Sequence, residues 1–213
     1  MSTAIDTSLV PQYFQRFPVR RHKDEPLIAQ GVNGIRKTFE RLVPERHARS
    51  HAVGPYGVVY AFCYPEGKTE RVKFAAEIVE ALWLYDDIIE VLPHEEAALE
   101  HATVIQMLAG DKHRMAPGKK NLMTSIFSDT RDQITALDPK GAPLLIEMLQ
   151  QYLIEYDAND KTYNDIEDYC TFRILNVGFG MMAYFVEWTL DIHLTEEETQ
   201  LTKEFYAASG RVM

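Results

Sequence analysis

The stretch FAAEIVEALWLYDDIIE, residues 74–90, contains the pattern that decides the fold of this chain. Apolar side chains recur in it at intervals of three and four residues, which is the spacing of one face of an α-helix. Asp86 falls on this apolar face and Glu90 follows four residues later, whereas Glu77 and Glu80 fall on the opposite face. The pattern therefore predicts a helix that directs two carboxylates toward the interior of the protein.

A carboxylate at Asp86 on a core-facing surface requires a partner. Moving an unpaired, ionised carboxylate out of water costs roughly several kcal/mol or more. The partner could be a metal ion, a cationic side chain, or a proton retained because the pKa of the carboxyl group is raised. Other polar residues that are predicted to face the core can help to decide which of these partners is present.

The composition of the 213 residues indicates a globular protein with one sizeable core. Hydrophobic residues make up 46% and charged residues 25% of the chain, as in a typical soluble protein. The formal net charge of −10 argues against nucleic acid as a main partner, because phosphate binding requires a basic surface. No apolar run reaches the ~20 residues of a membrane span, and Cys63 and Cys170 form no CxxC pair. We therefore expect a cytoplasmic protein with reduced thiols, no membrane span and no nucleic-acid partner.

Helical patterns account for most of the remaining chain. The apolar spacing predicts helices over residues 25–43, 94–108, 122–137, 144–156 and 164–190, the last of them capped by Asn164. Thr195 with Glu198 predicts a capping box that begins a C-terminal helix. The aromatic stretch GPYGVVYAFCYPEG, residues 54–67, predicts a short buried helix, because the sequence offers no other strand-like run to pair with it. These helices and their short links predict an all-α bundle.

The helix predicted over residues 164–190, NDIEDYCTFRILNVGFGMMAYFVEWTL, contains a second anomaly. Arg173 and Asn176 fall within its apolar stripe, so a guanidinium is also predicted on a core-facing surface. Gly178 and Gly180 follow, and glycine only destabilises a helix unless the helix must bend or another group must approach closely. The pattern therefore predicts a helix that is weakened just after Asn176.

Two interpretations of the inward charges follow from the residues alone. Asp86 or Glu90 could form a buried ion pair with Arg173 that holds two helices in register. Alternatively, the carboxylates, the arginine and the aromatic residues on the same faces form a functional site. The combination of both anomalies favours a site. The signatures of several other sites are absent from the sequence, which contains no HExxH, no GxSxG and no Glu-x-x-His pair.

The segments LYDDIIE (residues 84–90) and FRILNVG (residues 172–178) together resemble the cyclase domain of class I terpene synthases. The closest likeness is to the fungal chimeric di- and sesterterpene synthases, in which a cyclase domain precedes a prenyltransferase domain. The separation of 87 residues between Asp86 and Arg173 is part of this resemblance, which extends over most of the chain. It implies an all-α class I terpenoid synthase bundle around a central cavity, with one cyclase domain over residues 1–213.

For the acidic segment, the resemblance implies magnesium binding. Asp86 and Glu90 would ligate Mg²⁺ with Asp87 in support, since Mg²⁺ binds carboxylate oxygens together with substrate phosphates. A cluster of three Mg²⁺ ions is implied for the complete domain. The second metal motif of the family should follow shortly after AASGRVM, residues 207–213. The resemblance therefore implies a chain that is truncated before this motif and has little activity on its own.

For the second segment, the resemblance implies recognition of a diphosphate. Arg173 would bind diphosphate oxygens and Asn176 would act as a linker, because an arginine forms strong bidentate hydrogen bonds to phosphate. The backbone of Val177 and Gly178 would act as an effector at a break in the helix. Residues that would line a dry pocket and stabilise positive charge are Tyr60, Phe62, Trp83, Met181 and Tyr184.

The reaction implied by the resemblance is cyclisation of a linear C20 or C25 prenyl diphosphate with release of diphosphate. Its substrate would be geranylgeranyl or geranylfarnesyl diphosphate, and a prenyltransferase domain would follow in the same polypeptide. A chain-elongating prenyl diphosphate synthase is an alternative, although such enzymes normally need two facing aspartate-rich motifs and the sequence contains one. A non-catalytic helical domain with a buried ion pair is the other alternative.

Overall fold

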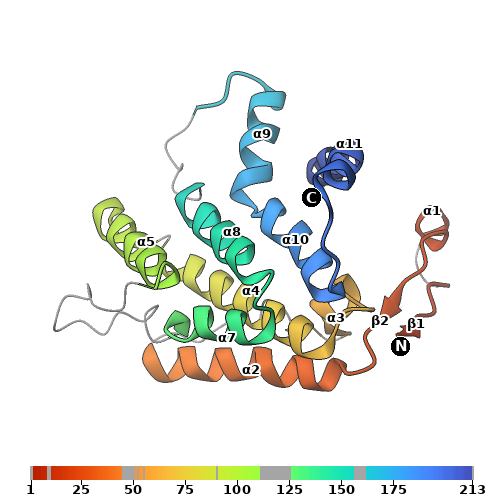
Figure 1. Ribbon diagram of the computed structural model, residues 1–213, viewed down its shortest axis with the longest axis horizontal. Coiled ribbons are helices and arrows are strands. Elements are labelled where there is room, and N and C mark those ends of the chain that lie inside the picture. Colours follow the sequence, from red (N-terminus) through yellow and green to blue (C-terminus); the bar gives the residue numbers. More distant parts are fainter. Residues whose placement is uncertain are drawn as a thin grey trace. The chain divides into compact units, whose positions relative to one another are not determined.

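The computed structural model describes residues 2–8, 11–44, 51, 53–54, 56–89, 91–110, 126–155 and 162–212. Within these ranges the chain is mostly helical, and its strands form two short antiparallel pairs (Figure 1). The prediction of an all-α fold is confirmed. The first compact unit comprises residues 1–90 with 189–191, and the second comprises residues 91–188 with 192–213.

The first unit is built on two long helices that lie side by side, α2 (Glu25–Leu42) and α4 (Thr69–Ile89) (Figure 1). Helix α2 confirms the helix predicted over residues 25–43, and it buries Ile28, Val32 and Phe39. The shorter elements of this unit are β1 (Thr3–Ala4), α1 (Gln12–Gln15), β2 (Arg20–Arg21), β3 (Val53–Gly54), β4 (Gly57–Val58) and α3 (Val59–Cys63).

Helix α4 is buried on almost every side, because its sequence is apolar around most of its circumference. The predicted core-facing residues Ala75, Ile78, Val79 and Leu82 are all buried. Glu80 is also fully buried, so the face of α4 that lies opposite the predicted stripe is covered as well. A hydrogen bond from a backbone N–H to the Oε1 atom of Glu80 (3.2 Å) offsets part of the lost hydration of this carboxylate.

The stretch over residues 54–67 contains both a helix and a strand. Helix α3 confirms the predicted short helix, and its residues Tyr60 and Ala61 are buried. The expectation that this stretch had no strand partner was wrong, because β4 pairs with β3 immediately before it. Gly57 closes the turn with a φ of 122°, a value that residues other than glycine rarely adopt.

The second unit contains α5 (His94–Leu108), α7 (Thr130–Leu137), α8 (Ala142–Glu155), α9 (Ile166–Asn176), α11 (Glu196–Val212) and all of α10 (Phe179–Leu190) except its last two residues. Helices α5, α7 and α8 contact one another. Their largest fully buried side chains are Leu108, Ile134, Leu145, Leu149 and Leu153. The helix predicted over residues 122–137 is interrupted by a turn at residues 128–129, and residues 122–125 lie outside the described part of the chain.

The single helix predicted over residues 164–190 is two helices, α9 and α10, which are joined at Val177 and Gly178 (Figure 1). The N-cap of α9 is Asp165 rather than Asn164, because the Asp165 side chain accepts a hydrogen bond from the N–H of Asp168 at 2.8 Å. The predicted capping box of α11 is confirmed. In it the N–H of Thr195 donates to Oε2 of Glu198 at 2.7 Å, and the N–H of Glu198 donates back to Thr195 Oγ1 at 3.3 Å.

Two further expectations from composition agree with the structure. Cys63 and Cys170 are both free thiols. Among the helices in the described ranges, none combines the length and the apolar character needed to cross a membrane.

Candidate functional site

The acidic segment forms the last turn of helix α4. Asp86 and Asp87 are both half-buried, and the helix ends shortly after them at Ile89. The Oδ1 atom of Asp86 is buried, whereas the side chain of Asp87 is 44% exposed. Glu90, the other predicted metal ligand, lies outside the described residues. The structure therefore places two of the three predicted carboxylates together at one end of a buried helix.

The location of these carboxylates favours a bound cation. The C-terminal end of an α-helix carries a partial negative charge, and the last turn of α4 contains no basic residue. Two carboxylates there make the local potential more negative, so a nearby cation would be stabilised. Because the donor atoms are carboxylate oxygens, the segment suits a hard cation such as Mg²⁺.

Aromatic side chains of the first unit lie near one another on α3 and α4. Tyr60 is buried and contacts the half-buried Trp83, with 5.8 Å between the ring centroids. Tyr64 stacks on Tyr60 at 6.2 Å, and burial raises the pKa of Tyr64, so its phenol remains neutral. Phe62 is half-buried. The structure thus brings together Tyr60 and Trp83 among the predicted lining residues.

Arg173 lies on α9 and is exposed, contrary to the core-facing position predicted from the apolar stripe. No described residue of α9 is buried, so the apolar side chains of this helix do not mark a covered face. The Nη1 atom of Arg173 donates a hydrogen bond to Oδ1 of Asn176 at 2.6 Å. The two predicted diphosphate-recognition residues are therefore in contact. The exposed guanidinium does not carry the desolvation cost that a buried ion pair would impose.

The chain changes from α9 to α10 at the two residues that were predicted to form a helix break. Asn176 is the last residue of α9, and the N–H of Val177 donates to the carbonyl of Arg173 at 2.9 Å. Gly178 has a φ of 71°, which ends the helix, and its N–H donates to the carbonyl of Leu175 at 2.9 Å. Helix α10 begins at Phe179, directly after this break, and the first N–H groups of a helix have no partner within the helix.

The remaining predicted lining residues lie on α10. Met181 and Tyr184 are both buried in the second unit. They are three residues apart, so they lie on one side of α10, beginning near the helix break. Gly180, which was predicted to mark a bend or a close approach, lies within α10, and a Cβ there would meet no atom within 4 Å. The prediction for Gly180 was wrong.

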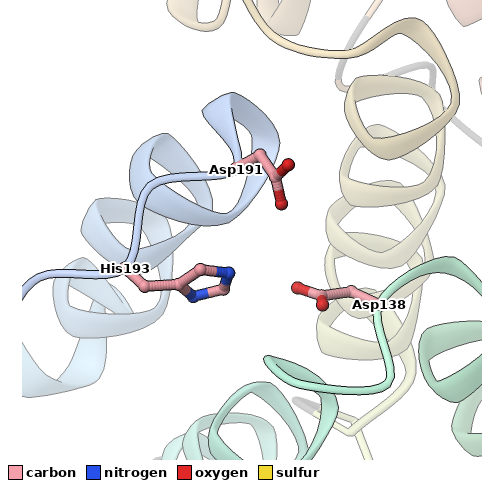
Figure 2. A group of neighbouring side chains, drawn as sticks. All are labelled: Asp138, Asp191 and His193. Atoms are coloured by element: carbon pink, nitrogen blue, oxygen red, sulfur yellow. The ribbon is translucent and has the colours of Figure 1, made fainter.

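Figure 2 shows three other side chains of metal-ligating type, Asp138, Asp191 and His193. Asp191 belongs to the first unit, where it forms ion pairs with Lys68 and with Nη2 of Arg71, the latter at 3.0 Å. Asp138 and His193 belong to the second unit. These three residues therefore come from different compact units.

Residues 77–213 match the family model described as terpene synthase family 2, C-terminal metal binding. The chain belongs to terpene synthase family 2. This membership confirms the resemblance predicted from the acidic and arginine segments.

The chain is also similar to individual members of this family. It is 25% identical to a variediene synthase from Aspergillus brasiliensis, over 96% of this chain and 30% of that protein. It is 22% identical to a bifunctional sesterterpene synthase from Talaromyces wortmannii, over 87% of this chain and 25% of that protein. Among solved structures, aristolochene synthase from Penicillium roqueforti superposes with a TM-score of 0.67 at 16% identity, covering 90% of this chain and 65% of that one. The fold is therefore that of the class I terpenoid synthases, and the chain spans about a third or less of these two curated relatives.

Two contacts of the candidate residues, one within each unit, were not predicted from the sequence. His51 Nε2 lies 3.1 Å from Oδ2 of Asp87, although 36 positions separate the two residues in the chain. Tyr152 lies against Gly178, where a Cβ would come within 2.9 Å of its ring. Neither position belongs to a periodic pattern or a motif, because such contacts depend on how distant segments pack together.

Proposed function

We propose that this protein is a Mg²⁺-dependent terpene cyclase that acts on a linear C20 or C25 prenyl diphosphate, geranylgeranyl or geranylfarnesyl diphosphate. In the proposed reaction the allylic C–O bond ionises and diphosphate leaves with the bonding electrons. The carbocation then cyclises and loses a proton to give the neutral hydrocarbon. The observation that carries the proposal is the pair of half-buried carboxylates at the C-terminal end of α4, in a chain that belongs to a metal-binding terpene synthase family. The names of the variediene and sesterterpene synthases support the choice of substrate class.

Asp86 and Glu90 would hold the Mg²⁺, with Asp87 in support. When bound, Mg²⁺ supplies positive charge that stabilises the departing diphosphate. The buried Oδ1 atom of Asp86 and the partial negative charge of the helix end favour this assignment. We extend the proposal to three Mg²⁺ ions in the complete domain, because a diphosphate offers more oxygen ligands than one ion requires.

Arg173 and Asn176 would bind the diphosphate group. An exposed guanidinium can donate two parallel hydrogen bonds to phosphate oxygens, and its present bond to Asn176 keeps it close to the helix break. The backbone at Val177 and Gly178 would respond to the ligand, because the N-terminus of α10 that follows attracts anions. These residues would thus hold the leaving group by hydrogen bonds and by the helix dipole.

Aromatic and sulfur-containing side chains would surround the hydrocarbon part of the substrate. Tyr60, Phe62 and Trp83 supply ring faces in the first unit, and the faces of aromatic rings attract positive charge. Met181 and Tyr184 supply apolar surface in the second unit. Their role would be to exclude water, which would otherwise capture the carbocation. We also propose that the protein acts in the cytoplasm and is joined to a prenyltransferase domain in the same polypeptide.

Binding and turnover by the same set of variants test this proposal in the full-length polypeptide. Mg²⁺ with inorganic pyrophosphate should raise the melting temperature by about 5–10 °C at saturation, much more than either alone, since each supplies ligands for the other. Asp86→Ala and Arg173→Ala should lose this shift and reduce hydrocarbon formation from geranylgeranyl or geranylfarnesyl diphosphate on the order of 10²–10³-fold. Product analysis by gas chromatography and mass spectrometry measures the turnover.

Asp132→Ala and Lys203→Ala are matched controls, because both residues are exposed and lie on other helices, α7 and α11. They should retain the shift and the turnover. Equal shifts in the wild type and in both site variants would contradict the proposal. With isopentenyl diphosphate added, formation of a longer prenyl diphosphate that is lost in Asp86→Ala would identify chain elongation at this acidic segment instead of cyclisation. A large loss of stability in Asp86→Ala or Arg173→Ala, with turnover retained, would identify a structural ion pair.

A further inference from the structure

His51 contacts helix α4 at three successive levels. Its backbone N–H donates to Oε1 of Glu80 at 3.2 Å, and its ring centroid lies 5.6 Å from that of Trp83. Its Nε2 atom lies 3.1 Å from Oδ2 of Asp87. Residues 80, 83 and 87 are three and four positions apart, so they are neighbours along one side of the helix. His51 therefore lies along the side of α4 that ends at the acidic segment.

The contacts of His51 with Glu80 and Trp83 restrain the imidazole independently of its bond to Asp87. Glu80 is fully buried, so its carboxylate relies on protein donors rather than on water, and this fixes the backbone of His51. The half-buried ring of Trp83 limits the movement of the imidazole. A side chain that is already restrained loses little further conformational entropy when it forms a hydrogen bond.

The hydrogen bond to Asp87 has a defined direction. An ionised carboxylate can only accept hydrogen bonds, so the hydrogen of this bond is on Nε2 of His51. The bond engages Oδ2 of Asp87 and restricts the rotation of its carboxylate. Outer residues that hold metal-binding carboxylates in this way typically change metal affinity by about 10–100-fold when they are removed.

We propose that His51 is a positioning residue for the acidic segment, which fixes the orientation of the Asp87 carboxylate through its Nε2–H and so supports the cation site. The inference deepens the proposed function and rests on it. It assigns different roles to two adjacent carboxylates, with Asp86 as a ligand and Asp87 as its support. It also places a residue in the site that lies before the family match, which starts at residue 77.

The side-chain bond between His51 and Asp87 should contribute little to folding stability. The side chain of His51 is 26% exposed and that of Asp87 is 44% exposed, and pairs of this exposure are worth little. Removing the imidazole should therefore leave the melting temperature of the ligand-free protein nearly unchanged. A variant of His51 that changes the Mg²⁺ midpoint without changing the stability of the ligand-free protein would therefore indicate a positioning role and not a structural one.

Three variants separate the contacts of His51. His51→Phe keeps a ring against Trp83 but lacks the donor, and His51→Gln restores an N–H donor at the same number of bonds from Cα, on a more flexible side chain. Lys73→Met is the control, since it removes the Lys73–Glu77 ion pair (2.7 Å), which lies on the same helix but far from its acidic end. MgCl₂ is titrated at saturating inorganic pyrophosphate in the full-length polypeptide. The Mg²⁺ midpoint is read from the rise in melting temperature.

We expect His51→Phe to raise the Mg²⁺ midpoint about tenfold, with partial recovery in His51→Gln and no change in Lys73→Met. In an Asp87→Ala background, His51→Phe should cause no further change, because His51 acts through Asp87. If the wild type responds to Mg²⁺ and pyrophosphate while His51→Phe has the same midpoint, this inference is overturned and the proposed function stands. An equal effect of His51→Phe with and without Asp87 also overturns it. A wild type without any response overturns the proposed function and the inference together.

Discussion

Gly178 is the residue at which the α9–α10 segment acquires its shape. Its φ of 71° lies in the left-handed region, which residues with a Cβ adopt only at a cost in free energy. The ring of Tyr152 on α8 also occupies the space next to it, since a Cβ would come within 2.9 Å of two ring carbons. Backbone conformation and packing therefore both require glycine at this position.

Gly178→Ala should lower the free energy of unfolding by about 1–3 kcal/mol, of which about 1–2 kcal/mol comes from the left-handed backbone. Gly180→Ala is the matched control, because position 180 is helical and a Cβ there would meet nothing within 4 Å. It should be stabilising by about 0.5–1 kcal/mol. Urea denaturation of both variants measures the difference. Similar values for the two variants would show that the break does not depend on Gly178.

The double variant Gly178→Ala with Tyr152→Ala separates the two causes. Removing the ring of Tyr152 relieves its contact with a Cβ at position 178 but leaves the cost of the left-handed backbone. In this background, Gly178→Ala should therefore lower the free energy of unfolding by less. If its cost is unchanged, the ring of Tyr152 does not restrict position 178.

At the scale of the elements, helices α10 and α11 are joined by a hydrogen bond from the hydroxyl of Tyr206 to Oε1 of Glu187 (3.0 Å). Burial, followed by this bond and by the negative charge of Glu187, raises the pKa of Tyr206 to about 12. An unfolded tyrosine has a pKa of about 10. Because the folded pKa is the higher one, this group stabilises the fold fully below about pH 10, and the contribution is lost as the pH rises toward 12.

Tyr206→Phe should lower the free energy of unfolding by about 1 kcal/mol at pH 8, where the hydrogen bond is intact. The difference from the wild type should shrink between about pH 10 and about pH 12, because Tyr206 ionises in the unfolded wild type before it ionises in the fold, which lowers the stability of the wild type. Urea denaturation at pH 8 and at pH 11 measures both effects. All other ionisable groups are the same in both proteins, so the comparison isolates Tyr206.

Tyr56→Phe serves as the control for Tyr206→Phe, because the side chain of Tyr56 is 87% exposed. Its dependence on pH should match that of the wild type. A difference between Tyr206→Phe and the wild type that stays constant from pH 8 to pH 11 would contradict the assigned role of the bond.

At the scale of the whole molecule, the first unit includes residues from two distant parts of the chain. The N–H of Lys68 donates to the carbonyl of Thr189 at 2.7 Å, and Nη2 of Arg71 pairs with Oδ1 of Asp191 at 3.0 Å. The side chain of Arg71 is only 8% exposed, so its guanidinium depends on protein acceptors. Asp191 has a φ of 60°, which an aspartate or asparagine tolerates better than most residues. Residues 189–191 thus complete the start of α4.

Asp191→Ala should lower the free energy of unfolding by about 1.5–3 kcal/mol, because it removes a charged acceptor from a nearly buried guanidinium. Asp191→Asn should cost less, since asparagine keeps an acceptor and tolerates the left-handed backbone. Urea denaturation measures the two values, and hydrogen exchange should show reduced protection in the first turns of α4. Equal stability of Asp191→Ala and Asp191→Asn would mean that Arg71 does not depend on this carboxylate.

The sequence by itself determined the local structure and the family. The spacing of three and four residues predicted α2 and α4, the pair Thr195 and Glu198 predicted the start of α11, and glycine after Asn176 predicted the helix break. Each of these signals acts within about one or two helical turns, where steric fit and backbone hydrogen bonds are set by neighbouring residues. The acidic and arginine segments were sufficient to predict membership of the terpene synthases.

Only the tertiary structure decided which faces are covered and which distant residues meet. The apolar spacing of α9 predicted a core-facing Arg173, yet that side chain is exposed, because periodicity reports an apolar stripe and not what covers it. Glu80 was placed on the opposite face of α4 and is fully buried, since His51 supplies a backbone donor to it. The bond from His51 to Asp87 was likewise absent from every pattern in the sequence. Such contacts arise when the chain brings remote segments together, and no local spacing encodes them.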